Sequence, residues 1–314
     1  MDAFLHNLSL ASPLFLLVLI GHVVMRFSGW PTSVSDSLTL FVFNLAIPVM
    51  LFRLMSDSAK LPSMDLRLLL AFFGGCLIVF AIGRVVSWKF FGLDGVSQSI
   101  FGFGCVYSNG ILLGLPLVRI TFGDAAMPSA VVVLVFNAMI LLTLTTVSIE
   151  WAKHGRLSLR DIALTSKGVL MNPIIFSVLL GTLFGFSGFT LPESVDVPLS
   201  MISQASSPLA LIVLGMGLVE YGIGEGWRLS LGICLLKLFV TPLIVWGLAK
   251  LLEIPPLETQ VVVLLASVSV GANVFLMSRR FRVLESTIAG SLVLSTPLAA
   301  ITTPLMLSFI GKIG

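Results

Sequence analysis

The chain has 314 residues, of which 57% are hydrophobic and only 11% are charged, and its formal net charge is +3. Soluble domains carry about 25% charged residues, so a chain of this length with so few charges could not cover a soluble surface. The composition excludes a soluble fold, and the small, dispersed positive charge excludes nucleic acid as a partner. It predicts an all-α polytopic membrane protein whose surroundings are the lipid bilayer.

Ten apolar segments follow one another along the chain, and each can form a helix of the roughly 20 residues that cross a bilayer. They cover residues 6–27, 34–55, 66–91, 97–120, 125–150, 169–188, 195–220, 228–250, 258–279 and 284–311. The first is interpreted as a retained span rather than a signal peptide, because no basic residues precede it and no small-residue cleavage site follows it. The three cysteines lie inside apolar segments, which favours buried thiols over disulfides or metal ligands. No metal or other cofactor is predicted.

The distribution of lysine and arginine predicts the orientation. Of the 18 such residues, 11 lie in the odd-numbered loops, including the long connection 151–168, and 6 lie on the opposite side. The positive-inside rule places the odd loops in the cytoplasm and both termini outside, in a cell inner (plasma) membrane protein. Four tryptophans also lie at the odd loops, as an interfacial belt requires: Trp30, Trp88, Trp151 and Trp227.

The two halves of the sequence match each other at an offset of 160 residues. The matched pairs are Pro13 with Pro173, Gly21 with Gly181, Pro48 with Pro208, and Thr143 with Thr303. Five spans per half is an odd number, so the second half must be inverted in the membrane, as in many secondary transporters. We therefore predict a first five-helix repeat over residues 1–150, a cytoplasmic loop over 151–168 and a second, inverted repeat over 169–314.

The fourth segment is a poor continuous helix. Glycines, each costing about 1 kcal/mol relative to alanine, occur at Gly102, Gly104, Gly110 and Gly114. Pro116 has no N–H to donate to the Leu112 carbonyl. In a bilayer a broken helix survives only where protein or a wet cavity satisfies its backbone. The polar pair Ser108 and Asn109 at the break is typical of a transporter binding site, although a proline-kinked packing helix explains the same residues.

The ninth segment has a weak point at the corresponding place of the second half, with Gly271 and Asn273 beside two serines. A pair of interrupted helices in matching halves indicates a transporter binding site, so the repeat favours that interpretation of Asn109 and Asn273. Their amides both donate and accept hydrogen bonds. The half-helices that follow the breaks offer free N–H groups and positive dipole ends, which attract an anion.

Two further polar residues lie inside spans. Asn137, in the fifth segment, either lines the same pocket or makes an interhelical hydrogen bond. Lys237 lies about ten residues into the eighth segment, where a lysine costs at least about 2.5 kcal/mol and usually faces a cavity or a partner. A structural or electrostatic role near the two breaks is favoured over direct contact with a ligand. Snorkelling, or a structural bond to carbonyls at the helix breaks, is the further alternative.

Four stretches, in this order, resemble the motifs of the auxin efflux carrier family, and the similarity covers essentially the whole chain. Phe43 to Phe52 resembles the second-helix motif and Ser108 to Leu117 the fourth-helix motif, while Lys167 to Gly181 and Ser207 to Gly215 resemble the sixth and seventh. The chain lacks the long central hydrophilic loop of the plant members. It therefore resembles the bacterial carboxylate permeases of the family.

The resemblance implies ten helices in two inverted repeats, with helices four and nine crossing at their broken midpoints. Helices 1, 2, 6 and 7 would form a scaffold and any homodimer contact, and helices 3–5 and 8–10 a moving transport domain. Two departures stand out: the ninth helix has no proline between Val268 and Gly271, and Ala71 to Gly74 replace the carboxylate and lysine of the plant members. The candidate substrate-binding residues are Asn109, Gly110, Pro116, Asn137, Lys237, Gly271 and Asn273.

The leading hypothesis is a secondary carrier that moves a small organic anion, such as malonate, malate or an auxin-like acid, by an elevator-type mechanism. A channel-like facilitator is the alternative, but it would require rings of polar residues along several helices. An intramembrane enzyme is not favoured, because the sequence has no zinc-protease motif, no paired intramembrane aspartates and no serine-hydrolase elbow. No span has an Asp or Glu at its middle, so obligatory coupling to sodium is not expected.

Overall fold

The computed structural model of the chain describes residues 2–56, 65–154, 173–219 and 226–313. Within these ranges the secondary structure is helical, apart from one bridged residue pair. The α-helices are α1 (Asp2–Phe27), α2 (Thr32–Phe41), α3 (Ile47–Ser56), α4 (Arg67–Phe91), α5 (Gly95–Val106), α6 (Leu115–Phe122), α7 (Met127–His154), α9 (Pro173–Phe186), α10 (Glu193–Gly217), α11 (Trp227–Leu235), α12 (Thr241–Leu251), α13 (Pro256–Ser267), α14 (Asn273–Phe281) and α15 (Glu285–Ile313). Three π-helical segments, η1 (Val42–Ala46), η3 (Gly110–Gly114) and η5 (Leu236–Val240), and one 3-10 turn, η4 (Asp124–Ala126), join some of them.

Several helical stretches are long and apolar enough to cross a bilayer. Among the described residues these are Thr32–Ser56, Arg67–Phe91, Asp124–Lys153, Glu193–Gly217, Trp227–Leu251 and Glu285–Ile310. Shorter apolar helices occupy the other predicted segments: Ala11–Phe27, Gly95–Val106, Gly110–Phe122, Pro173–Phe186 and Pro256–Ser267. The all-helical, multi-pass membrane architecture is therefore confirmed. The predicted loop 151–168 begins within α7, which continues to His154, and from residue 155 to 168 it lies outside the described residues.

Each π-helical segment ends two residues before a proline. The three prolines are Pro48 after η1, Pro116 after η3 and Pro242 after η5. Proline has no N–H and its ring clashes with the carbonyl four residues earlier. A π turn, which inserts one extra residue into the helix, relieves that clash without ending the helix. These prolines therefore widen the helical path locally instead of terminating it.

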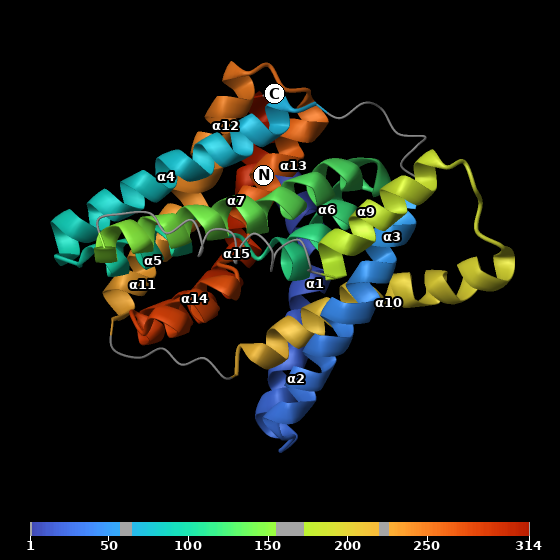
Figure 1. Ribbon diagram of the computed structural model, residues 1–314, viewed down its shortest axis with the longest axis horizontal. Helices are drawn as coiled ribbons and strands as arrows, with labels where there is room; N and C mark the ends of the chain where they lie inside the picture. The colour runs from blue at the N-terminus through green and yellow to red at the C-terminus, as the bar shows by residue number, and fades with distance from the viewer. Residues whose placement is uncertain (1, 57–64, 155–172, 220–225, 314) are drawn as a thin grey trace.

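Glycines allow two pairs of helices to approach closely. A Cβ atom on Gly21 of α1 would overlap the Ile212 carbonyl of α10, and one on Gly215 of α10 would overlap the Val18 carbonyl of α1. Similarly, a Cβ atom on Gly181 of α9 would lie 2.5 Å from the carbonyl oxygen of Phe52 in α3. Small residues are the usual means of close helix packing in membranes. Figure 1 shows α2, α3, α9 and α10 gathered on one side of the molecule.

A second group of helices packs around α4. This helix contacts α5 and α12, while α13 contacts α12 and α15. A Cβ atom on Gly75 of α4 would lie 2.6 Å from the Val245 side chain of α12. In Figure 1 this group occupies the opposite side of the molecule from α3 and α10.

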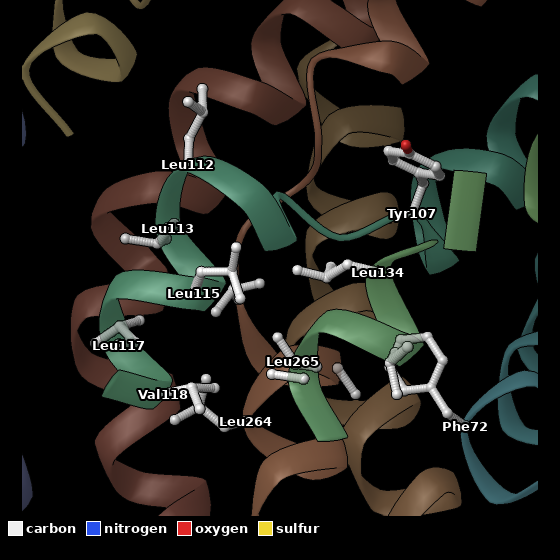
Figure 2. Packing of buried hydrophobic residues seen from close by; sticks show 14 of the residues in the cluster. Phe72, Tyr107, Leu112, Leu113, Leu115, Leu117, Val118, Leu134, Leu264 and Leu265 are labelled. Carbon is white, nitrogen blue, oxygen red and sulfur yellow. The ribbon is translucent and has the colours of Figure 1, made fainter. Parts of the chain in front are cut away.

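Buried leucines fill the space where η3, α6, α7 and α13 meet. Figure 2 shows Leu115 of α6 lying towards Leu134 of α7, and Val118 of α6 close to Leu264 of α13. Between helices in a membrane, such packing stabilises the fold through van der Waals contact rather than through removal of apolar surface from water. This packing fixes the second half of the interrupted fourth segment against α7 and α13.

Candidate functional site

The fourth and ninth predicted segments are both interrupted, at the places that the sequence indicates. Helix α5 ends at Val106, the backbone of Tyr107 is extended (φ −80°, ψ 109°), and η3 begins at Gly110. In the second half α13 ends at Ser267, Val268 is extended (φ −71°, ψ 165°), and α14 begins at Asn273.

The two interruptions lie against each other and pair through their backbones. Ser108 and Val270 form an antiparallel bridge. The Asn109 N–H donates to the Ser269 carbonyl at 2.8 Å, and the Gly271 N–H donates to the Tyr107 carbonyl at 2.9 Å. Each break thus provides hydrogen-bond partners for backbone groups that the other break leaves without a helical partner. This pairing is how unwound backbone is tolerated at membrane depth.

A side chain at Gly271 or at Gly110 would meet close neighbours. A Cβ atom on Gly271 would lie 2.8 Å from the Tyr107 ring and 2.9 Å from the Ser108 carbonyl oxygen, while one on Gly110 would overlap the Leu134 side chain. The sequence indicated these glycines as weak points of helices. For Gly271 the contacts give a second reason, because the other interrupted segment approaches it closely, whereas Gly110 faces the Leu134 side chain of α7.

The side chain of Asn273 is tied across the interruption to Tyr107. Its amide Nδ2 donates to the Tyr107 hydroxyl at 2.6 Å, and the side chain of Asn137 lies next to the same hydroxyl. Asn137 is 3% exposed and Asn109 is 6% exposed, whereas Asn273 is half-buried. The Asn109 carbonyl accepts from the N–H groups of Leu113 and Gly114. The three asparagines predicted from the sequence therefore come from different segments and lie at or beside the pairing.

Buried polar atoms without partners gather at this place. Within the described part of the chain, Ser108 Oγ, Ser269 Oγ and Asn137 Oδ1 are buried and have no hydrogen-bond partner. Each such atom costs about 1–3 kcal/mol if nothing binds it. A polar ligand or an ordered water that reached them would recover that free energy. The arrangement can therefore hold a small hydrogen-bonding solute beside the two half-helix starts.

Lys237 lies behind the pairing rather than among these atoms. It is completely buried in η5, and its Nζ donates to the Ala266 carbonyl in the last turn of α13. A cation at the carbonyl end of a helix is stabilised by the helix dipole. The contact is a bond to a carbonyl at one of the helix breaks, which is one of the alternatives that the sequence left open for this lysine.

Two threonines complete this support. Thr241 Oγ1 donates to the Cys105 carbonyl at 2.8 Å, in the last turn of α5, and Thr303 Oγ1 donates to the Ser267 carbonyl at 3.1 Å. Together with Lys237 they cap carbonyls that the two interruptions leave without helical partners. Residues around η5 thus hold both interrupted helices at once. Pro116, the remaining candidate, is buried at the second position of α6, just after η3.

Sequence reasoning missed Tyr107 and these threonines as members of the site. Tyr107 precedes the Ser108–Asn109 pair and is one of only two tyrosines in the sequence, which is a signal that could have singled it out. Thr241 is followed by Pro242, but nothing local indicates that its hydroxyl reaches Cys105, 136 residues earlier.

Two matches to known proteins bear on the function. The sequence model of a family described as "Membrane transport protein" matches residues 9–307. The chain is 24% identical over 297 residues to a protein of Rhizobium meliloti (strain 1021) described as a "Putative malonate transporter", and the match covers 93% of this chain and 92% of that protein.

Proposed function

Since this chain belongs to the membrane transport protein family, which includes the auxin efflux carriers, we propose that it is a secondary transporter of small carboxylates. The observation that carries this proposal is the backbone pairing of two interrupted helices beside buried polar atoms that have no partner. In transporters, interrupted helices of this kind supply the binding site at mid-membrane.

The chemistry of the pairing suits an anion. The helical stretches that begin at Gly110 and Asn273 present N–H groups and positive dipole ends. Hydroxyls of Ser108 and Ser269 and the amides of Asn109 and Asn273 add neutral hydrogen-bond donors. The relative's description as a malonate transporter supports a dicarboxylate as the first ligand to test.

An elevator-type movement is the proposed mechanism. Helices α1, α2, α3, α9 and α10 would form the scaffold, with any homodimer contact, and helices α4–α7 and α11–α15 the moving body. The close glycine contacts of α1 with α10 and of α3 with α9 support a rigid scaffold. Residues 1–150 and 169–314 would be the two inverted repeats, in a cell inner (plasma) membrane with both termini outside.

A channel-like facilitator is the second candidate. It requires a continuous polar path, whereas three of the buried unpartnered polar atoms in the described residues lie at the pairing: Ser108 Oγ, Ser269 Oγ and Asn137 Oδ1. Purified protein in liposomes separates the two candidates. Loading the vesicles with unlabelled malonate should drive uptake of labelled malonate that saturates with concentration. A single-channel current, without saturable countertransport, would contradict the carrier.

A further inference from the structure

A cleft separate from the paired interruptions lies between the two groups of helices. It has a volume of about 370 Å³ and is lined by Met50, Arg53, Leu54, Arg119, Asp124, Ala125, Met127 and Ser203. One wall comes from α3 and α10, and the other from α6, η4 and the start of α7. None of the residues predicted to bind substrate lines it. Its volume lies within the range of small-molecule sites.

Two arginines, one on each wall, give the cleft its chemistry. Arg53 donates from Nε to Asp196 Oδ1 at 2.9 Å and from Nη2 to Asp196 Oδ2 at 3.1 Å. Arg119 donates from Nε to Asp124 Oδ1 at 2.9 Å. A guanidinium binds a carboxylate with this forked geometry in proteins generally. In this structure Asp196 occupies the Arg53 fork, and Asp124 occupies the Nε donor of Arg119.

These carboxylates can be exchanged for those of a ligand. The side chain of Asp124 is 67% exposed and that of Asp196 is 41% exposed, whereas those of Arg119 and Arg53 are 38% and 25% exposed. Exposed ion pairs add little to the free energy of folding. A ligand carboxylate that replaces Asp124 on Arg119 therefore costs the protein little stability. Asp124 follows Gly123 at the start of a 3-10 turn and can swing into water.

We propose that this cleft is a second anion site, in which Arg119 and Arg53 bind the carboxylates of a small dicarboxylate and Asp124 and Asp196 are displaced. The ligand class rests on the proposed function, but the site does not share residues with the paired interruptions. Arg119 lies nine residues after Gly110, about 14 Å away at the rise of a helix. All four charged residues lie at the membrane face predicted to be extracytoplasmic. The proposed site therefore holds the anion at that face of the membrane, outside the paired interruptions.

The test measures equilibrium binding of labelled malonate to the purified full-length protein in which Asn109 and Asn273 are both replaced by Ala. Arg119→Gln in this background should weaken the remaining binding at least tenfold. Asp124→Asn should tighten it severalfold, because it weakens the competing bond to Arg119 Nε and removes a negative charge from the cleft. Arg119→Lys should recover part of the affinity but not all, since lysine lacks the fork.

The control is a matched ion pair outside the cleft. Arg67 and Asp65 form a similar exposed pair at the start of α4, with 2.6 Å between Nη2 and Oδ2. Arg67→Gln and Asp65→Asn should both leave malonate binding unchanged. In a ligand site, Arg119→Gln weakens malonate binding and Asp124→Asn tightens it. If the ion pair were purely structural, both substitutions would weaken binding.

Equal weakening by Arg119→Gln and Asp124→Asn, or unchanged binding in both, would overturn the cleft site. The proposed function fails separately, if the wild-type protein shows no countertransport of any small carboxylate. Binding that follows the predicted signs without countertransport would retain the cleft and reject the carrier.

Discussion

The amide of Asn273 donates to the hydroxyl of Tyr107 at 2.6 Å, so the first residue of α14 is bonded to the residue that follows α5. These residues are 166 positions apart in the sequence. Together with the backbone pairing of Ser108 and Val270, this bond fixes the relative position of the two interrupted helices and holds the Asn273 side chain beside Asn137.

Replacing Tyr107 with Phe keeps the ring and removes the hydroxyl that Asn273 uses. The loss of a neutral hydrogen bond costs about 1 kcal/mol, and Asn273 then loses its fixed orientation. We expect the KM for malonate to rise about fivefold, with the protein still folded. Initial uptake rates over a range of malonate concentrations measure this, and an unchanged KM would show that Asn273 does not depend on Tyr107.

Replacing Gly271 with Ala should damage the pairing itself. The new Cβ atom would lie within 3 Å of the Tyr107 ring and of the Ser108 carbonyl oxygen. Such overpacking costs about 1–3 kcal/mol, so the midpoint of thermal unfolding in detergent should fall and transport should be lost.

Gly247→Ala is the matched control, because a Cβ atom at that position meets nothing within 4 Å. Its unfolding midpoint should be unchanged or slightly raised. If the Gly271→Ala protein were as stable as the Gly247→Ala protein, the two interrupted segments could not lie as close together at Gly271 as the structure indicates.

Lys237 is expected to contribute to the stability of the folded protein rather than to malonate binding. Lys237→Leu leaves the Ala266 carbonyl buried without its donor, which costs about 1–3 kcal/mol. Lys237→Gln retains a donor and should be less destabilised. Unfolding midpoints of both variants, measured with and without malonate, test this. A Lys237→Leu protein that folds normally and loses only its affinity for malonate would instead place the lysine charge in substrate binding.

Transport should not require sodium. No Asp or Glu stands at the middle of a predicted span, and intramembrane carboxylates are the usual ligands of coupling ions. Malonate countertransport in liposomes with all sodium replaced by choline should stay within about twofold of its rate in sodium. A collapse of activity in choline would mean that backbone carbonyls at the interruptions hold a sodium ion.

The sequence indicated both interruptions because their cause is local. Glycine and asparagine at Asn109–Gly110 and Gly271–Asn273 disfavour a continuous helix wherever they occur. The bond of Thr241 to Cys105 and the cleft between Arg53 and Arg119 arise from contacts between distant segments, which no local pattern encodes. Lys237 falls between these cases: its burial followed from its position in an apolar segment, whereas its partner, the Ala266 carbonyl, required the packed structure.

The most direct test of the account is countertransport of labelled malonate by Asn109→Ala and Asn273→Ala proteins reconstituted at equal amounts. Gln204→Ala, which removes an exposed amide from α10, serves as the control. Each asparagine variant should lose at least tenfold in rate while it folds and inserts normally, and the control should keep the wild-type rate. Wild-type rates in both asparagine variants would contradict a binding site at the paired interruptions.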